Sequence, residues 1–315
     1  MKSSVTRFER SEILKKKLGF KKWFRDWQLY VLLLPAVINL LLFNYIPMYG
    51  AQIAFRDFSI RKGIWGSDWV GLKHFISFIN YPNFGLLLKN TLQIGLYGLL
   101  TFPCAVIFAL MLNEAGNIKL KKTIQMISYM PYFLSTVVVC SLIRLLLNEQ
   151  TGVVNKIIQF FGQEPVNFLS SRQLFDDVYT WSGVWQGLGF GAIIYIAALS
   201  NVSQELVEAA CIDGANRLQI IRHVKIPEIM PTITIMLILN CGAILGVGHE
   251  KILLLQNPLN ISRSQVISTY VYELGLISGQ FSYSSAVGLF NMVVNVLMLL
   301  IVNAIAKKVS DVGIW

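Results

Sequence analysis

The chain has 315 residues, of which 55% are hydrophobic and only 14% are charged, and its mean hydropathy is +0.57. A soluble domain carries about a quarter charged residues, so this composition excludes a protein surrounded by water on all sides. The formal net charge of +10 is compatible with nucleic-acid binding, but the basic residues gather beside apolar blocks, as in a membrane topology. We expect an all-α polytopic membrane protein that binds lipid and no nucleic acid.

Six apolar blocks have about the 20-residue length that crosses a hydrocarbon core of about 30 Å as a helix. They lie at Gln28 to Met48, Thr91 to Asn113, Tyr129 to Leu147, Val178 to Leu199, Ile229 to Val247 and Ala286 to Ile305. Pro35 and Pro103 fall inside two of them, and a helix bundle can satisfy the carbonyls that proline frees. The predicted organisation is a basic N-terminal segment (1–27), a first transmembrane helix with an external loop (28–90), a core (91–305) with a cytoplasmic loop at 201–231, and a tail (306–315).

The basic residues predict the orientation. Nine Lys and Arg residues precede the first block, and alternate loops then carry Lys119, Lys121, Lys122, Arg217, Arg222, Lys225, Lys307 and Lys308. The opposite side has fewer basic residues, spread over longer loops. Both termini are therefore expected in the cytoplasm. The first apolar run is too long for a signal peptide and lacks a small-residue cleavage site, so we expect a retained helix.

Three external segments are expected at about Tyr49 to Asn90, Asn148 to Asp177 and Gly248 to Ser285. They contain too many aromatic residues for disordered chain: Trp65, Trp69, Phe75, Phe78, Phe168, Phe175, Tyr270, Tyr272 and Phe281. The first interpretation is aromatic belts and short amphipathic helices at the membrane surface. Contact with an external partner is the alternative.

Catalytic motifs are absent from the sequence. It contains no GxxxxGK[ST], HExxH, CxxC or GxSxG pattern, so we expect no catalytic residue and no ATP hydrolysis by this chain. Four cysteines and three histidines show no metal-ligand spacing and no external cysteine pair. No metal site and no disulfide are expected.

The stretch from Asn201 to Pro231 is more polar than its flanks and predicts two short cytoplasmic helices. Ser203 is a plausible N-cap, followed by Gln204 and Glu205 in a first turn that favours negative charge. Val207, Ala210 and Cys211 share one side of this helix. Asp213 and Gly214 then turn the chain, where a side chain at Gly214 would obstruct a tight bend or a closely approaching partner. A second helix is expected from Arg217 to Val224, ended by Pro227 and Pro231 at the return to the membrane.

The residue string EAACIDGANRLQIIRHVKIPEIMP resembles the signature loop of the permease subunits of ABC importers. In that family the loop forms coupling helices that insert into a groove on a cytoplasmic ATPase. The resemblance implies a docking element made of Glu208, Ala209, Ala210, Asp213, Gly214 and Ala215 and closed by Pro227. Ile221 and Ile226 stand where relatives often carry an aromatic residue and a leucine, which are conservative departures.

The resemblance covers most of the chain. NTLQIGLYGLLTFPCAVIFALMLNE is similar to the entry of the family's core domain, and WSGVWQGLGFGAIIYIAALSNV to the helix before the docking loop. LYVLLLPAVINLLLFNYIPMYGAQIAFRDF and GHEKILLLQNPLNISRSQVISTYVYELGL resemble the carbohydrate-uptake subset, specifically the YteP/LplB-like larger permease partner for complex oligosaccharides. This implies a bacterial plasma-membrane protein that forms half of a pore with a second permease, two ATPase subunits that bind ATP and Mg, and an external solute-binding lipoprotein that delivers the oligosaccharide.

A sugar cavity needs aromatic faces and amide or carboxylate groups on transmembrane helices. The candidates in the predicted spans are Tyr132, Ser135, Trp181, Trp185, Gln186, Asn240 and Asn291. Packing or interfacial anchoring is the alternative for each of them, and interhelical hydrogen bonding for Asn291, Asn295 and Asn303. The spacings Gly183 to Gly187 and Gly242 to Gly246 predict close helix packing. Glu250 and Lys251 could face an anionic sugar or each other.

Other functions are weighed against this interpretation. An ABC importer of a solute other than sugar fits the same loop. A secondary transporter would need ionisable residues within the spans, which are nearly free of them. A membrane enzyme would need a convergent catalytic set, and a membrane scaffold would leave the cytoplasmic loop unexplained.

Overall fold

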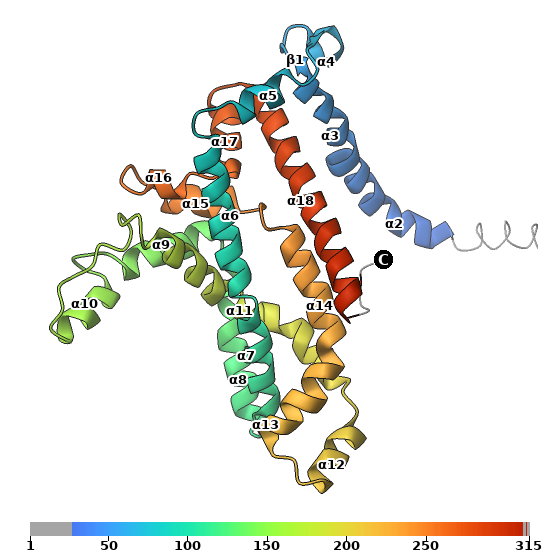
Figure 1. Ribbon diagram of the computed structural model, residues 1–315, viewed down its shortest axis with the longest axis vertical. Coiled ribbons are helices and arrows are strands. Elements are labelled where there is room, and N and C mark those ends of the chain that lie inside the picture. The colour runs from blue at the N-terminus through green and yellow to red at the C-terminus, as the bar shows by residue number, and fades with distance from the viewer. Residues whose placement is uncertain (1–26, 311–312, 314–315) are drawn as a thin grey trace, which may run out of the picture. The chain divides into compact units, whose positions relative to one another are not determined.

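The computed structural model describes residues 27–310 and Gly313 (Figure 1). The predicted basic N-terminal segment therefore lies almost wholly outside the described residues. The described chain divides into a small part, with residues up to Ile53 and Phe58–Ser67, and a large part, with Ala54–Asp57 and Asp68 onward.

The small part is built on the first predicted span. Its helix runs without a break through α2 (Trp27–Leu40), the π-helical turn η1 (Leu41–Tyr45), α3 (Ile46–Tyr49) and the 3-10 turn η2 (Gly50–Phe55). The helix is apolar enough to cross a membrane, and no residue of α2 is buried, as expected where lipid is the solvent. A short α4 (Gly63–Gly66) follows, and the Ser67 hydroxyl there accepts from Ser59 N–H and donates to the Gly63 carbonyl.

Proline is accommodated by a wide turn at two places in the chain. The π-helical turn Leu41–Tyr45 ends two residues before Pro47, and η4 (Ile221–Lys225) ends two residues before Pro227. Proline lacks an N–H and its ring meets the carbonyl four residues earlier. Since a π turn bonds each carbonyl to the fifth residue on, it moves that carbonyl and lets the helix continue.

The large part contains the other spans. They are α6 (Phe84–Leu100) with α7 (Pro103–Glu114), α8 (Ile118–Tyr129) with η3 (Met130–Phe133) and α9 (Thr136–Leu146), α11 (Phe175–Ser200), α13 (Arg217–Ile220) with η4 and α14 (Ile226–Gly242), and α18 (Phe281–Ser310). With the first helix, the described residues hold five helices long and apolar enough to span a membrane, or six if the bent α8–α9 pair counts as one. The predicted all-α polytopic class is confirmed.

The third predicted span is wrong as a single helix from Tyr129 to Leu147. The helix pair Ile118–Phe133 and Thr136–Leu146 is bent by 106°. Pro131 lies in η3, and Ser135 starts the new helix as its N-cap, with its hydroxyl accepting from Val138 N–H at 3.4 Å. The apolar run therefore contains a sharp bend that a hydropathy profile does not reveal, because a capped helix start does not interrupt the run of apolar residues.

α11 lies between α7, α8 and α14 and organises the core. Tyr195 and Ala192 of α11 pack with Val106 and Ala109 of α7 and with Ile229 of α14. The backbones of α11 and α8 also approach closely. A Cβ added at Gly189 would lie 2.3 Å from the Ser128 carbonyl oxygen. α11 is therefore the helix against which α7, α8 and α14 pack.

The three segments that were predicted to be external fold into a layer of short elements, called the external layer below. They are the two-stranded antiparallel pair β1 (Arg56–Asp57) and β2 (Asp68–Trp69), α5 (Lys73–Ile79), α10 (Val153–Phe160), α15 (His249–Leu255), α16 (Ile261–Ser264), α17 (Ile267–Tyr272) and the π-helical turn η5 (Glu273–Ile277). Phe78, Phe175 and Tyr270 are buried, and Phe78 packs edge-on against Phe84. These aromatic residues build a folded core, so the expectation of belts and surface helices alone is wrong for them. Trp65 and Trp69 remain exposed.

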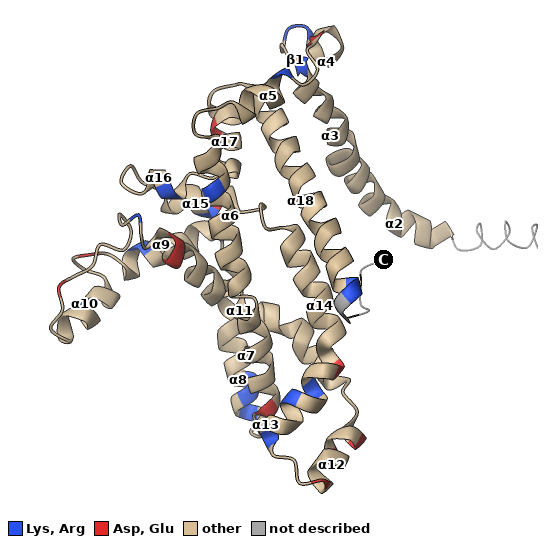
Figure 2. Cartoon of the chain, viewed as in Figure 1, with Lys and Arg blue, Asp and Glu red and all other residues tan. Residues whose placement is uncertain are grey.

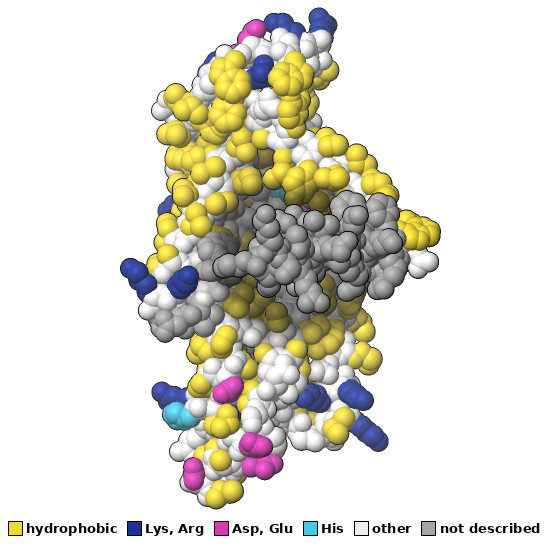
Figure 3. Space-filling view, turned by 90° about the vertical axis from the view of Figure 1, so that its right-hand side faces the viewer, with side chains coloured by type: hydrophobic (Ala, Val, Ile, Leu, Met, Phe, Trp, Pro, Cys, Tyr) yellow, Lys and Arg dark blue, Asp and Glu magenta, His cyan; other side chains and the backbone are white. Residues whose placement is uncertain are grey.

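Charged side chains are concentrated near the ends of the spans. Figure 2 shows Lys and Arg at the start of α8 and along α13 and η4, beside acidic residues of α12 (Gln204–Ile212). In Figure 3, hydrophobic side chains cover much of the described part of this face, and charged side chains gather at its upper and lower ends. The polar α12–α13 region thus lies at one end of the apolar spans of the large part.

Candidate coupling loop and transport cavity

The first helix of the loop at 201–231, called the coupling loop below, ends in a Schellman motif centred on Gly214. Gly214 has a φ of +80°, its N–H donates to the Cys211 carbonyl at 3.1 Å, and Ala215 N–H donates to the Ala210 carbonyl at 2.9 Å. A Cβ at Gly214 would meet nothing within 4 Å. A glycine is therefore required at this position because of the positive φ. The space where a Cβ would lie is open to a partner. Ser203 occupies the N-cap position of α12 but its side chain makes no capping hydrogen bond, so that expected contact is absent.

The second helix begins with a capping box that the sequence interpretation missed. The Asn216 side chain accepts from Gln219 N–H at 2.9 Å, and the Gln219 side chain accepts from Asn216 N–H at 2.8 Å. The spacing of an N-cap residue and a glutamine three positions later was a readable signal for this start.

The predicted end of the second helix at Pro227 and Pro231 is wrong. The chain is helical from Arg217 to Gly242, and both prolines lie inside this span. The wide turn η4 accommodates Pro227, as described above. As a result, the coupling loop and the fifth span share one continuous helix.

The loop exposes apolar side chains at the end of the molecule farthest from the external layer (Figure 1). Ile212 is 86% exposed and Leu218 is 76% exposed. Among the predicted docking residues, Glu208, Ala209, Asp213 and Gly214 are exposed and Ala210 and Ala215 are half-buried, while Pro227 lies in the helix above. Apolar side chains in water beside small and acidic residues are typical of a surface that another protein covers.

A buried ion pair fixes the base of the loop. Lys225 of η4 donates to the Glu114 carboxylate at the end of α7, and both side chains are largely buried. The pair joins the helix that leaves the loop to the second span. Nothing in their separation of 111 positions along the chain indicated this contact.

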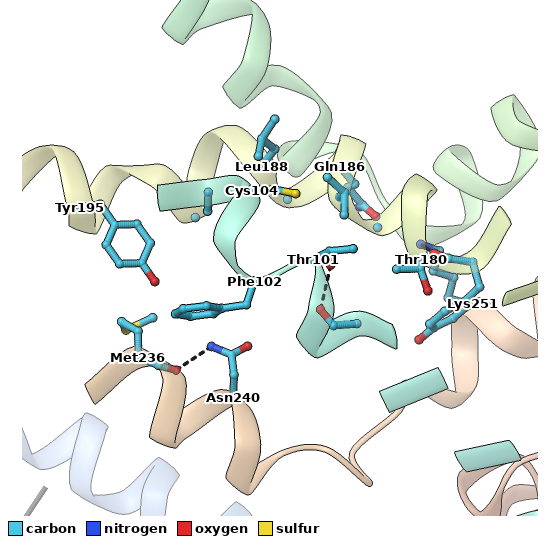
Figure 4. A pocket seen from close by; sticks show the side chains of 17 residues that line it. Thr101, Phe102, Cys104, Thr180, Gln186, Leu188, Tyr195, Met236, Asn240 and Lys251 are labelled. Carbon is cyan, nitrogen blue, oxygen red and sulfur yellow. Dashed lines mark hydrogen bonds between the residues drawn. The ribbon is translucent and has the colours of Figure 1, made fainter. Parts of the chain in front are cut away.

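A cavity of about 540 Å³ runs along one face of α11 (Figure 4). Thr180, Gly183, Gly187, Gly191 and Tyr195 line it at helical spacing, over a length of about 24 Å at 1.5 Å per residue. The facing wall includes Thr101 and Phe102, which form the break between α6 and α7, and Met236, Asn240 and Lys251. Pro103, the first residue of α7, follows this break directly, so a proline inside an apolar block was the available signal for Thr101 and Phe102.

Two of the seven predicted substrate residues line this cavity, Gln186 and Asn240. The Asn240 amide donates to the Met236 carbonyl at 2.8 Å, and its oxygen is left for another donor. Gln186 donates to the Leu134 carbonyl at 3.4 Å. Both amides can therefore still accept a hydrogen bond from a ligand in the cavity.

The other five candidates lie elsewhere. Trp181 and Trp185 line a separate apolar pocket on another face of α11. Tyr132 stacks on Phe190 with ring centroids 3.8 Å apart, and Ser135 caps α9. Asn291 donates to the Leu245 carbonyl at 3.3 Å in a hollow beside α14. The position of these residues in the sequence places them in predicted spans. Whether a residue reaches the cavity depends on the side of the helix on which it lies.

The two glycine spacings have different roles. A Cβ at Gly242 would lie 2.3 Å from Leu299 Cδ1, so this residue does bring α14 close to α18. Gly246 lies after the end of α14, and Gly183 and Gly187 face the cavity. Close helix packing was therefore the wrong interpretation for these three, because a small residue also leaves room for a ligand path.

Comparison with known proteins identifies the family. Residues 83–311 match the model of the "Binding-protein-dependent transport system inner membrane component" family. The chain belongs to this family. As a permease subunit of an ABC transporter it is not an enzyme, which confirms the expectation of no catalysis.

Relatives are similar over nearly the whole length. The chain is 42% identical to the polygalacturonan/rhamnogalacturonan transport system permease protein YteP of Bacillus subtilis over 96% of this chain and 94% of that protein. It is 41% identical to protein LplB of the same organism over 92% of each. A crystal structure of a bacterial ABC transporter involved in import of the acidic polysaccharide alginate contains a chain with 37% identity and a TM-score of 0.83, covering 92% of this chain and 99% of that one. The predicted resemblance is confirmed, and the permease family excludes the secondary-transporter alternative.

Proposed function

We propose that this chain is one of two permease subunits of an ATP-driven importer of oligosaccharides and that the cavity along α11 is its part of the translocation path. The observation that carries the proposal is the joint presence, on one helical framework, of an exposed coupling loop and a cavity that contains hydroxyl and amide groups. The names of the relatives support a sugar, since YteP is named for polygalacturonan and rhamnogalacturonan and the similar structure for alginate.

The cavity lining suits a sugar. Thr101 and Tyr195 provide hydroxyl groups, and Gln186 and Asn240 provide amides. Phe102 adds an aromatic side chain to the wall (Figure 4). Carbohydrates present alternating hydroxyl groups and apolar ring faces, and such a mixed surface can bind both.

Coupling follows from the helix that joins the two regions. Arg217 begins this helix at the loop, and Asn240 lies in its last turn at the cavity. In this proposal two cytoplasmic ATPase subunits bind ATP and Mg, close on each other and move α12 and α13. The helix carries the displacement to the cavity, provided that the contacts of the loop differ between two states of the assembly.

The remaining partners follow from the same assembly. A second, related permease completes the pore, and an external solute-binding protein delivers the sugar. A crystal structure of a bacterial alginate ABC transporter in complex with an alginate pentasaccharide-bound periplasmic protein contains a chain with 37% identity and a TM-score of 0.84 over 94% of this chain. We place the loop and both termini in the cytoplasm, and Lys307 and Lys308 in the last turn of α18 agree with this orientation.

The test is uptake by the whole importer in vesicles. Glu208→Lys reverses a charge on the exposed side of α12, and Gly214→Trp places a large side chain in the space reserved for a partner and strains a φ of +80°. Both variants are expected to abolish oligosaccharide uptake and substrate-stimulated ATP hydrolysis while the chain still inserts in the membrane. Glu164→Lys, an equal charge reversal at an exposed external position, is the matched control. Wild-type stimulation of ATP hydrolysis in Glu208→Lys would refute the coupling role.

A further inference from the structure

The cavity contains one charged side chain that oligosaccharide import as such does not require. Lys251 reaches it from α15, in the external layer, and lies against α11 (Figure 4). Its Nζ donates to the Tyr179 carbonyl at 2.8 Å and lies 4.8 Å from the centroid of the Tyr179 ring. Gly183 makes room for it, since a Cβ there would lie 3.2 Å from Nζ.

The positive charge of Lys251 has no counter-charge in the described chain. Lys73, Lys225 and Arg263 each form an ion pair with a carboxylate, but no carboxylate of the described residues pairs with Lys251. A carbonyl and a ring face attract the ammonium group without neutralising it, and they leave N–H donors unused. Burial lowers the pKa of Lys251 to about 8, with a smaller opposing effect of Cys140. The group is therefore still mostly protonated at neutral pH.

The rest of the cavity lining contains no group that could neutralise Lys251. No Asp or Glu lines the cavity, whose other polar side chains are the neutral hydroxyl and amide groups already named. A partly buried cation without a counter-ion raises the free energy of the empty cavity. An anionic ligand would remove that cost, whereas a neutral ligand would leave it.

We propose that Lys251 binds the carboxylate of an acidic oligosaccharide in the cavity, so that the permease itself prefers uronate-containing sugars to neutral ones. This inference rests on the proposed function, because it requires the cavity to be the sugar path. It assigns a selective residue to the permease in addition to any choice made by the external binding protein. The competing role for Lys251 is structural, as an anchor of α15 on the Tyr179 carbonyl.

The test uses the complete importer, with its binding protein and ATPase subunits, in proteoliposomes. Initial uptake of tetragalacturonate is compared with uptake of its fully methyl-esterified form, which has the same backbone and no charge. Lys251→Met keeps the length and loses the charge, and Lys251→Arg keeps the charge. A charge-assisted hydrogen bond predicts that tetragalacturonate uptake falls about tenfold in Lys251→Met, with little change for the ester. Lys251→Arg is expected to restore most of the preference.

Two further variants separate charge from packing. Gly183→Ala crowds Nζ without changing charge and is expected to lower acid uptake more than ester uptake. Lys156→Met, at an exposed external position, is the matched control and keeps the wild-type preference. Equal losses for acid and ester in Lys251→Met, or no loss, would overturn the inference in favour of the anchor role. Wild-type uptake of the ester as fast as the acid overturns the inference alone, as does an importer that takes up only neutral oligosaccharides. An importer that takes up no oligosaccharide, acidic or neutral, overturns the proposed function as well.

Discussion

Two polar regions interrupt the apolar spans, and they differ in how they are stabilised. The external stretch that contains α15, α16 and α17 is tied to the core from many sides. Asn260 is fully buried and donates to the Leu169 carbonyl at 2.9 Å, and Asn90 donates to the Gln265 carbonyl at 2.9 Å. Arg263 adds an ion pair with Asp176 of α11.

The coupling loop has much less internal support. No residue of α12 is buried, and the hydrogen bonds that shape the loop are local caps and turns. Both regions expose large apolar side chains, such as Phe160 in the external layer and Ile212 in the loop, but only the external layer also has a buried core. The difference teaches that neither polarity nor exposed apolar side chains alone identify a docking region, and that the lack of a core of its own distinguishes the loop.

The largest expected effect is on assembly. Ile212→Asp places a charge at the tip of the loop, where the side chain is 86% exposed. We expect loss of ATPase co-purification with no loss of thermal stability, because the residue has few contacts within the chain. Ile60→Asp, at a position that is 76% exposed, is the control and retains the ATPase. Retention of the ATPase by Ile212→Asp would show that the tip of the loop does not hold the ATPase.

The next effect is on the external core. Phe78 is 1% exposed and packs edge-on with Phe84 and Phe290. Phe78→Ala is expected to lower the free energy of unfolding by about 3–5 kcal/mol, measured by thermal unfolding in detergent. Phe160→Ala, where the ring is 86% exposed, is expected to have little effect. A small effect of Phe78→Ala would mean that the layer is held by its hydrogen bonds and not by its aromatic core.

A moderate effect is expected where the loop joins the bundle. Glu114→Gln leaves Lys225 largely buried without its counter-charge and should cost about 1–3 kcal/mol. The exchange of both charges, Glu114→Lys with Lys225→Glu, should recover part of the loss. If the single and double variants are equally destabilised, the ion pair is not what joins the loop to α7.

The smallest effect is expected from a cap. Asn216→Ala removes the hydrogen bond to Gln219 N–H and should cost about 1 kcal/mol, whereas Asn216→Asp keeps an acceptor and should cost less. Because the cap also orients α13, we expect Asn216→Ala to lower the uptake rate clearly even under conditions in which the variant stays folded. Equal stability of Asn216→Ala and the wild type would show that partner contacts hold α13 in place.

Local signals were readable in the sequence. Apolar length predicts most of the spans, and Gly214 is predicted to lie in a turn, where a side chain would obstruct a tight bend. The structure confirms the turn, but the reason is the positive φ of Gly214 and not crowding within the chain. The docking residues were identified by resemblance, and their contacts with an ATPase stay a prediction. The cavity was only partly predictable. Residue type selects Gln186 and Asn240, which line the cavity, but it also selects Trp181 and Trp185, which lie on another face of α11.

Features that depend on tertiary structure were not predictable. The external aromatic core and the Lys225–Glu114 pair each join residues whose sequence neighbourhoods contain no signal for the contact. Pro131 and Ser135 mark the place of the bend at η3, but they do not determine its angle of 106°. Lys251 was noticed as a charge at the end of a span, with two open interpretations. The Lys251 side chain reaches the cavity because of the position of α15 in the fold. The hydropathy of the sequence does not predict that position.

The helix from Arg217 to Gly242 has a mechanical consequence. Its 26 residues span about 39 Å of hydrogen-bonded backbone, so the coupling loop and Asn240 are connected by a single rod and not by a hinge. A push on α13 is expected to shift the far end of the rod by a similar distance. The wide turn at Ile221–Lys225 interrupts the regular hydrogen bonding of this helix, and Lys225 ties the turn to α7. A displacement of α13 is therefore expected to reach the wall of the cavity through the helix and α7 together.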